Sequence, residues 1–200
     1  MYSFKVLLEG EEIEFEGETK SDALFKLDGY MEDLLEKRTF RDRESYVKRC
    51  TSHKLVYYLN EVRAYFKLAG LGICPPLLSH GIAFEYKIIS EQDRRGFYKT
   101  GPAPKLKERT YYAYYIETEL YGSSLGKEYD TLGKWRLDSR NLEKEFNFFP
   151  FPEFVREQIR DLVQRMHQRG VYHGDLHPDN ILIKDGKVKI IDFELCEFAP

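Results

Sequence analysis

The sequence predicts an α+β fold, because helical and strand-like patterns both occur and follow one another along the 200-residue chain. Apolar residues recur at three- and four-residue steps in 21–35, 55–69 and 154–166, which is typical of amphipathic helices. Short apolar runs lie between these segments, and two such runs joined by Asp185-Gly186 predict a β-hairpin near the C-terminus. A chain of this length can bury one sizeable core or two small lobes.

The first part of the chain is expected to contain a sheet. Residues 4–8 and 13–15 are strand-like runs on either side of a turn at Gly10, so they predict an N-terminal hairpin. Ser21 or Asp22 is a candidate cap for the helix that follows. The other elements expected before residue 121 are a strand at 46–50, a helix at 55–69 that stops at Gly70, a strand that follows Pro75-Pro76 and reaches Ile89, and a buried strand at 111–120.

A charged segment at 91–109 separates the last two of these strands. It contains Gly and Pro and carries the most basic patch of the chain, formed by Lys99, Lys105, Lys107 and Arg109. This composition is typical of a loop, and we expect the patch to be solvated rather than to bind a partner.

Composition and charge exclude several classes of protein. Lys and Arg number 31 against 34 Asp and Glu, a formal charge of -3, so the chain lacks the basic excess that nucleic-acid binding normally needs. No apolar stretch approaches the roughly 20 residues of a membrane-spanning helix, and the N-terminus turns acidic where a signal peptide would be apolar. We therefore expect no nucleic-acid partner, no membrane partner, and a cytoplasmic or nuclear location.

The three cysteines, Cys50, Cys74 and Cys196, are far apart in the sequence and form no C-x-x-C pair. An odd number at irregular spacing is typical neither of a disulfide framework nor of a zinc site built from cysteines. We expect all three to be reduced thiols.

The residues that carry chemistry surround the C-terminal hairpin, whose sequence is NILIKDGKVKIID from Asn180 to Asp192. Asp-Gly is favoured in two-residue type I′ turns, so Lys184 is expected to pair with Lys187. Counting outward from that pair puts Asn180 opposite Ile191. Asn180 and Asp192 are therefore expected to be near neighbours at the open end of the hairpin.

A third polar residue, Asp175, precedes Asn180 by five residues. The local sequence thus brings two carboxylates and one amide oxygen, from Asp175, Asn180 and Asp192, to one place. Such hard oxygen groups suit Mg²⁺, which takes one or two carboxylates and completes its octahedron with waters and phosphate oxygens. The pattern predicts metal-assisted phosphoryl transfer.

These motifs resemble those of a known family. HGDLHPDN followed by IIDFE is similar to the catalytic loop and metal-binding segment of the protein-kinase-like fold, written H-x-D-L-x-x-x-x-N and D-F-G. His177 stands where typical serine/threonine kinases have Lys, so the segment is more similar to aminoglycoside and choline phosphotransferases and to small atypical kinases. The resemblance implies a bilobal α+β fold with a sheet-based N-lobe and a partial helical C-lobe.

The resemblance also implies where the lobes lie along the chain. We expect residues 1–120 to form the N-lobe, with the helix at 52–69. Residues 121–200 would form the hinge and a partial C-lobe. Within this second part, 171–180 would be the catalytic loop and 192–194 the metal-binding segment.

The same resemblance implies that the chain would be an ATP-dependent, Mg²⁺-dependent kinase or phosphotransferase, which would transfer the γ-phosphate to a hydroxyl of a protein or a small molecule. Asp175 would accept or orient the proton of the attacking hydroxyl. Asn180 would hold a metal ion, and Asp192 would bind the Mg²⁺ that bridges the nucleotide phosphates. His173 would support the loop.

Earlier segments match the same fold. Lys48 on an expected strand and Glu61 in the helix that follows would form the ion pair that holds the α and β phosphates, and Lys54 is a poorer candidate for the lysine. Glu119 and Tyr121 lie in a segment that resembles the hinge, which grips adenine through backbone groups.

Three features depart from the family pattern. No G-x-G-x-x-G occurs, Glu194 stands where the family has Gly, and the chain ends eight residues after Asp192. The loop that covers the phosphates is therefore expected to be missing or replaced, and the second lobe to be partial. These features favour an alternative, a pseudokinase that keeps the fold as a nucleotide-binding or scaffolding module.

A further alternative is a metal-dependent hydrolase with His173, Asp175 and His177 as ligands, because alternating H-x-D-x-H can chelate a transition metal. It treats the neighbouring kinase-like residues as coincidences, and no other histidine cluster exists in the sequence to complete a tetrahedral site. Tightly bound zinc would indicate the hydrolase, nucleotide-dependent Mg²⁺ the kinase, and neither the scaffold.

Overall fold

The computed structural model describes residues 1–39, 45–93, 109–129 and 151–199. It contains both helices and antiparallel sheets, which confirms the α+β prediction. The chain divides into two compact units. The first comprises Met1–Arg41, Val47–Leu55 and Gly81–Ile116, and the second comprises Asp42–Tyr46, Val56–His80 and Glu117–Pro200.

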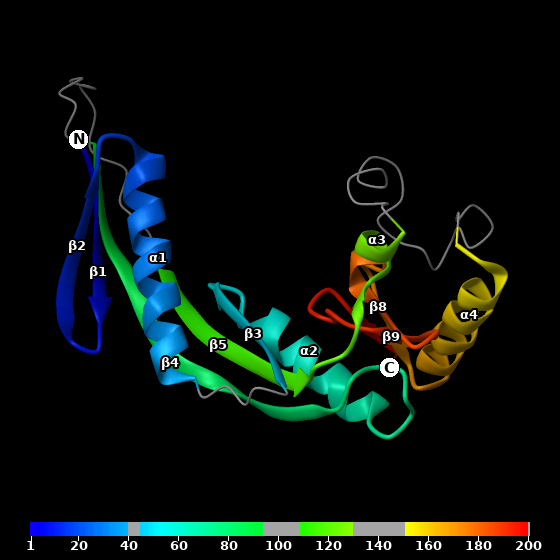
Figure 1. The fold of residues 1–200 in the computed structure, drawn as a ribbon. Coiled ribbons are helices and arrows are strands. Elements are labelled where there is room, and N and C mark those ends of the chain that lie inside the picture. The colour runs from blue at the N-terminus through cyan, green and yellow to red at the C-terminus, as the bar shows by residue number, and fades with distance from the viewer. Residues whose placement is uncertain (40–44, 94–108, 130–150, 200) are drawn as a thin grey trace. The chain divides into compact units, whose positions relative to one another are not determined.

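The largest sheet has five strands, which are β1 (Tyr2–Leu8), β2 (Glu11–Gly17), β3 (Ser45–Ser52), β4 (Leu77–Asp93) and β5 (Arg109–Glu119). They lie in the order β2-β1-β4-β5-β3 (Figure 1). The predicted N-terminal hairpin is confirmed, and its turn at Glu9 and Gly10 has left-handed φ values of 52° and 90°.

The prediction of a loop over residues 91–109 is wrong at both of its ends. Strand β4 continues to Asp93, whose backbone pairs with Tyr2 of β1, and β5 begins at Arg109. The pairing with β1 extends the strand into residues that their charge alone would place in a loop. Lys99, Lys105 and Lys107 lie outside the described residues.

Helix α1 (Lys20–Arg38) runs along the β1–β2 hairpin (Figure 1). Its N-cap is Thr19, not the predicted Ser21 or Asp22. The Thr19 hydroxyl accepts a hydrogen bond from the Asp22 N–H, and the Asp22 carboxylate accepts one from the Thr19 N–H, which moves the cap upstream. The core between helix and sheet consists of Val6, Leu8, Phe15, Leu27, Met31, Leu35, Phe84, Tyr86 and Ala113.

Replacing Thr19 by alanine should lower the free energy of unfolding by about 1 kcal/mol, because the N-cap hydroxyl satisfies a backbone donor of the first turn. Urea denaturation measures this loss. Ser21→Ala is the matched control, since Ser21 is exposed within the same first turn. Equal destabilisation by the two substitutions would contradict the assignment of the cap.

The helices of the second unit include two long ones, as predicted. Each ends just before a glycine whose left-handed φ stops the helix, Gly70 (73°) and Gly170 (65°). Apolar residues at three- and four-residue steps line the buried side of the last helix. Among the residues that the structure describes, the α-helices of this unit are α2 (Leu55–Leu68), α3 (Leu125–Glu128) and α4 (Glu153–Gln168).

Short strands complete the second unit, and its hairpin has the predicted register. Lys184 pairs with Lys187, and the two turn residues, Asp185 and Gly186, have the positive φ values of a type I′ turn, 50° and 72°. The elements are β6 (Ser123–Ser124), β7 (Val171–Tyr172), the 3-10 helix η3 (Pro178–Asn180), β8 (Ile181–Lys184), β9 (Lys187–Ile190) and β10 (Glu197–Phe198).

Helix α4 holds this hairpin through one side chain. The Gln158 amide donates to the Gly186 carbonyl at 2.8 Å and accepts from the Val188 N–H at 3.3 Å. The hairpin is also bonded to the loop that follows α2, because the Ile190 N–H donates to the carbonyl of Ile73 at 2.8 Å. The hairpin is therefore fixed to elements from two distant parts of the sequence.

Two other expectations concern the whole chain. The three cysteines are thiols, and Cys74 and Cys196 are buried. In the part of the chain that the structure describes, no helix combines the length and apolar character needed to cross a membrane.

Candidate active site

The buried His173 organises the loop that leads to the hairpin. Its Nδ1 accepts a hydrogen bond from the Asp175 N–H at 3.3 Å, and its Nε2 lies 2.9 Å from the Ile191 carbonyl oxygen. Because Nδ1 accepts, the proton of the neutral ring is on Nε2, which donates to Ile191. Both ring nitrogens thus contact the backbone, so the hydrolase alternative, in which His173 binds a metal, finds no support.

A glycine allows this loop to approach the segment that follows Asp192. Gly174 has a left-handed φ of 78°, and a Cβ added to it would lie 2.4 Å from the Leu195 carbonyl oxygen. Any larger residue would push the two segments apart.

Asn180 links Asp175 to the hairpin. The side-chain nitrogen of Asn180 donates to the backbone carbonyl of Asp175 at 3.0 Å. The backbone carbonyl of Asn180 accepts from the Ile191 N–H, also at 3.0 Å. Since the nitrogen is used in the first bond, the Asn180 amide oxygen is the atom that could bind a metal. The predicted proximity of Asn180 to the residue before Asp192 is therefore confirmed.

The chain turns sharply at Asp192, whose φ of 67° lies in the left-handed region. Such a conformation is unfavourable for most residues, and Asp and Asn tolerate it better than others. The next residue, Phe193, is fully buried, with its ring 5.4 Å from the ring of Tyr65 on α2 and 5.1 Å from that of His173. This packing anchors the backbone between Asp192 and Glu194.

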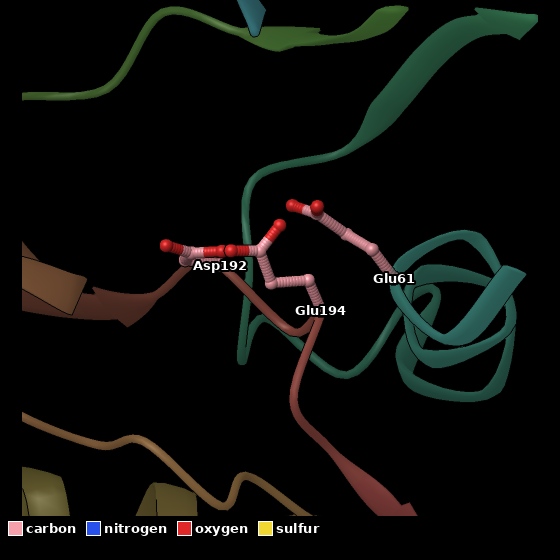
Figure 2. Close-up of side chains that lie close together, drawn as sticks. All are labelled: Glu61, Asp192 and Glu194. Carbon is pink, nitrogen blue, oxygen red and sulfur yellow. The ribbon is translucent and has the colours of Figure 1, made fainter. Parts of the chain in front are cut away.

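Three carboxylates, from Glu61, Asp192 and Glu194, form an acidic cluster (Figure 2). One oxygen atom of each lies within 4.8 Å of the others, and the Glu61 side chain is buried. At such a distance two like charges repel by roughly 3 kcal/mol at the effective dielectric constant of protein sites. A cation bound close to these oxygens would offset the repulsion between them.

The donor chemistry of this region fits Mg²⁺. The acidic cluster offers carboxylate oxygens, and Asn180, which carries an amide oxygen, has its backbone bonded to Ile191, the residue before Asp192. All are hard ligands of the kind that Mg²⁺ prefers. Sequence analysis anticipated Glu194 beside Asp192, but it did not anticipate that Glu61 approaches Asp192.

Asp175 lies in the loop next to His177, whose Nε2 is 3.9 Å from a carboxylate oxygen of Asp175. The other ring nitrogen of His177 accepts from the Asp179 N–H at 3.3 Å, which caps η3. The Asp175 side chain is about a third exposed, so a substrate can reach it.

Lys48 and Glu61 occur on the expected elements. Lys48 lies half-buried on β3 in the first unit, and Glu61 lies on α2 in the second. The ion pair between them stays a prediction. Lys54 directly precedes α2, and its N–H donates to the Ser52 hydroxyl at 3.0 Å.

The N-terminal hairpin does not adjoin the strand of Lys48. Strands β4 and β5 lie between β1 and β3, so β1 is three strand spacings, about 14 Å, from β3. The hairpin turn is also tied to α1, because the Arg38 guanidinium makes two hydrogen bonds, of 2.7 and 2.8 Å, to the Glu9 carboxylate. This turn is therefore poorly suited to cover phosphates near Lys48.

The segment that resembles a hinge contacts the loop that follows α2 and also the C-terminal hairpin. The Glu119 N–H donates to the Pro76 carbonyl at 3.1 Å, so only the carbonyl of Glu119 could bind adenine. The Tyr121 hydroxyl donates to the Lys187 carbonyl at 3.1 Å, and Lys189 lies over its ring. Burial, with a smaller effect of Asp185, raises the pKa of Tyr121.

Sequence analysis missed the aromatic contact that joins α2 to the site. Tyr65 follows Glu61 by four residues, so the two lie one turn apart on the same side of the helix. That spacing was the available signal, but the partner of Tyr65, Phe193, is far away in the sequence.

Comparison with known proteins identifies the C-terminal segment. Residues 150–200 match the family model described as protein kinase domain. This segment is protein-kinase-like. It contains α4, η3 and the hairpin, together with Asp175, Asn180 and Asp192.

Individual relatives point in the same direction. The chain is 39% identical over 75 residues to 3-deoxy-D-manno-octulosonic acid kinase of Vibrio parahaemolyticus, covering 37% of this chain and 32% of that protein. It is 40% identical over 65 residues to serine/threonine-protein kinase ppk34 of Schizosaccharomyces pombe, covering 30% of this chain and 18% of that protein. It is 30% identical over 64 residues to KEOPS complex subunit Bud32 of Pyrococcus abyssi, covering 31% and 29%. The matches thus span about a third or less of each relative's length.

Proposed function

We propose that the chain binds ATP and Mg²⁺ and transfers the γ-phosphate to a hydroxyl group of a protein or small-molecule acceptor. The observation that carries this proposal is the hydrogen-bonded connection of Asp175, Asn180 and the open end of the hairpin that leads to Asp192. The protein-kinase-like sequence of residues 150–200 supports it.

Each polar group then has a role. Asp175 accepts or orients the proton of the attacking hydroxyl, and it lies in a loop held by the buried His173. Asn180 and Asp192 hold the metal through an amide oxygen and a carboxylate. When bound, Mg²⁺ would neutralise the charge of the nucleotide phosphates. Positioning and charge neutralisation supply most of the rate, because phosphoryl transfer needs little covalent chemistry from the protein.

The nucleotide would be held by residues outside this segment. Lys48 and Glu61 pair to position the α and β phosphates, and the backbone at Glu119 and Tyr121 binds adenine. In this proposal residues 1–120 act as the N-lobe, and residues 121–200 as the hinge and a partial C-lobe.

The class of acceptor stays open within the proposal. One relative is named as the kinase of a sugar acid, 3-deoxy-D-manno-octulosonic acid, and another as a serine/threonine-protein kinase. Both kinds of acceptor present a hydroxyl group, so the same roles of Asp175, Asn180 and Asp192 would serve either.

A pseudokinase is the second candidate function. The observation that favours it is the acidic cluster, in which Glu194 adds a carboxylate close to Asp192 and Glu61. This extra negative charge next to the metal site would oppose the approach of nucleotide phosphates unless a cation balances it. Such a chain would bind nucleotide or a protein partner without phosphoryl transfer.

ATP with Mg²⁺ should raise the melting temperature, because a ligand that binds only the folded state stabilises it by mass action. At a ligand concentration of about 100 Kd the stabilisation is about 2.7 kcal/mol. For a chain of this size that corresponds to a shift of roughly 5–10 °C.

The controls are ATP with a chelator, Mg²⁺ alone and Zn²⁺ alone. An unchanged melting temperature at millimolar Mg²⁺ and ATP, in a folded sample, would contradict nucleotide binding. A clear shift without measurable ATP turnover would favour the pseudokinase, and a shift with Zn²⁺ alone the hydrolase.

A further inference from the structure

His177 faces Asp175 across a gap that is wider than a hydrogen bond. The Nε2 atom of His177 lies 3.9 Å from a carboxylate oxygen of Asp175, and both side chains are about a third exposed. A hydrogen bond between two such atoms would need a separation of about 2.7–3.2 Å. An acceptor molecule can therefore reach both groups and place an atom between them.

The other side of the imidazole ring decides which nitrogen carries the hydrogen. Nδ1 of His177 accepts a hydrogen bond from the Asp179 N–H at 3.3 Å, so the proton of the neutral ring is on Nε2. A second proton, favoured by the Asp179 carboxylate 3.9 Å from Nδ1, would go to Nδ1 and leave the hydrogen of Nε2 in place. Nε2 is thus a donor that faces Asp175, whose ionised carboxylate can only accept.

The backbone of the loop fixes both side chains. The N–H and the carbonyl of Asp175 are bonded to the side chains of His173 and Asn180. The carbonyl of His177 accepts from the Asn180 N–H at 2.9 Å. Leu176, which lies between Asp175 and His177, is fully buried and anchors the loop. The gap between the two polar groups therefore does not depend on a bond between them.

A hydroxyl group fits this pair in its chemistry and in its size. It has one hydrogen to donate to Asp175 and two lone pairs, one of which can accept from Nε2 of His177. Two hydrogen bonds of about 2.8 Å to atoms 3.9 Å apart meet at an angle of about 90° at the shared oxygen. The second lone pair stays available to attack phosphorus. A protonated amine has no lone pair, so the pair suits oxygen acceptors rather than amines.

We propose that His177 binds the acceptor hydroxyl through its Nε2–H while Asp175 takes the hydroxyl proton. The inference deepens the proposed function and rests on it, since it assumes that Asp175 faces the attacking group. The O–H bond breaks and its proton goes to Asp175, a lone pair of the oxygen forms the bond to the γ-phosphorus, and ADP leaves with the electrons of the broken P–O bond. His177 keeps its hydrogen throughout and holds the oxygen in position.

Two substitutions separate this role from the capping of η3. Asparagine places its amide where Nδ1 lies, so His177→Asn keeps an acceptor for the Asp179 N–H and removes the donor that faces Asp175. Glutamine places its amide where Nε2 lies, so His177→Gln keeps that donor and loses the cap. His177→Asn should slow ATP hydrolysis, in which water is the acceptor, by about tenfold at saturating ATP and Mg²⁺. His177→Gln should recover most of this rate, although its melting temperature should fall by roughly 2–4 °C.

A binding measurement gives a readout without turnover. ADP with Mg²⁺ and fluoroaluminate imitates the phosphoryl group in transfer, with a water molecule in the attacking position. The wild type should bind fluorescent ADP more tightly with fluoroaluminate than without it. His177→Asn should reduce this gain by about tenfold and leave the binding of ADP alone unchanged. His53→Asn is the control, because His53 is exposed and lies outside the loop.

The hydrogen on Nε2 can be observed directly by NMR. Long-range ¹⁵N–¹H correlations of the imidazole rings distinguish the two neutral tautomers, and the signal of His177 is the one that is lost in His177→Asn. The form with hydrogen on Nε2 is expected in the wild type without nucleotide. The form with hydrogen on Nδ1 alone would overturn this inference and leave the proposed function untouched.

The remaining outcomes also separate the two proposals. A wild type that binds no nucleotide overturns the proposed function and this inference with it. An unchanged fluoroaluminate gain in His177→Asn, or equal losses in His177→Asn and His177→Gln, overturns this inference alone, because the ring would then only cap η3. A wild type that binds ADP without any such gain does the same. If His177→Asn does not fold, His177→Ser, which also supplies a capping oxygen, takes its place.

Discussion

Asp192→Asn is expected to remove most of the rise in melting temperature that Mg²⁺ and ATP cause. Asn is as well suited as Asp to the left-handed backbone at this position, where φ is 67°, so the fold should be kept. The substitution removes one negative charge and one carboxylate oxygen from the metal ligands. At a ligand concentration of about 100 times the wild-type Kd, a 100-fold weaker affinity would remove about 2.3 of the roughly 2.7 kcal/mol of ligand stabilisation.

Asp185→Asn is a closely matched control for this experiment. Asp185 also has a left-handed φ, 50°, and lies at the turn of the same hairpin, exposed and away from the acidic cluster. It should show the full ligand-dependent shift. If both variants keep that shift, or both lose it, Asp192 is not the metal ligand.

Asp175→Ala is expected to lower kcat by about 10²- to 10⁴-fold, which is the usual contribution of a general base, while ATP and Mg²⁺ still bind. Its backbone donates to His173 and accepts from Asn180, and alanine keeps both of these bonds. The loss should appear in kcat rather than in binding, because the proton of the attacking hydroxyl moves only in the transition state.

The control is Asp179→Asn in the same loop, whose carboxylate lies on the other side of His177 and should change kcat little. Turnover is measured as ATP hydrolysis and as transfer to candidate hydroxyl acceptors. Full turnover by Asp175→Ala would show that its assigned role is wrong. Binding of ATP and Mg²⁺ by a wild type without turnover would favour the pseudokinase.

The elements that could be predicted are those that depend on interactions between residues close together in the sequence. The register of the C-terminal hairpin could be predicted, because the Asp185-Gly186 turn and the two-residue alternation of strands are local properties. The predicted N-cap of α1 was wrong, because Thr19, Ser21 and Asp22 are all residue types that cap helices. Only the reciprocal hydrogen bonds between Thr19 and Asp22 show which of them is the cap. The predicted end of this strand at Ile89 was wrong, because pairing with β1 supplies hydrogen bonds that extend β4 to Asp93.

The same distinction applies to the site. The sequence alone determined the association of Asp175 and Asn180 with the hairpin that leads to Asp192, because one short loop and one tight turn bring these residues together. Only the tertiary structure decided that Glu61 joins Asp192 and Glu194, and that β4 and β5 separate the N-terminal hairpin from β3. These arrangements depend on the packing of side chains far apart in the chain, such as Tyr65 on Phe193, and on pairing between distant strands. Such contacts form wherever burial of apolar surface and backbone hydrogen bonding are most favourable for the whole chain, and no local spacing encodes them.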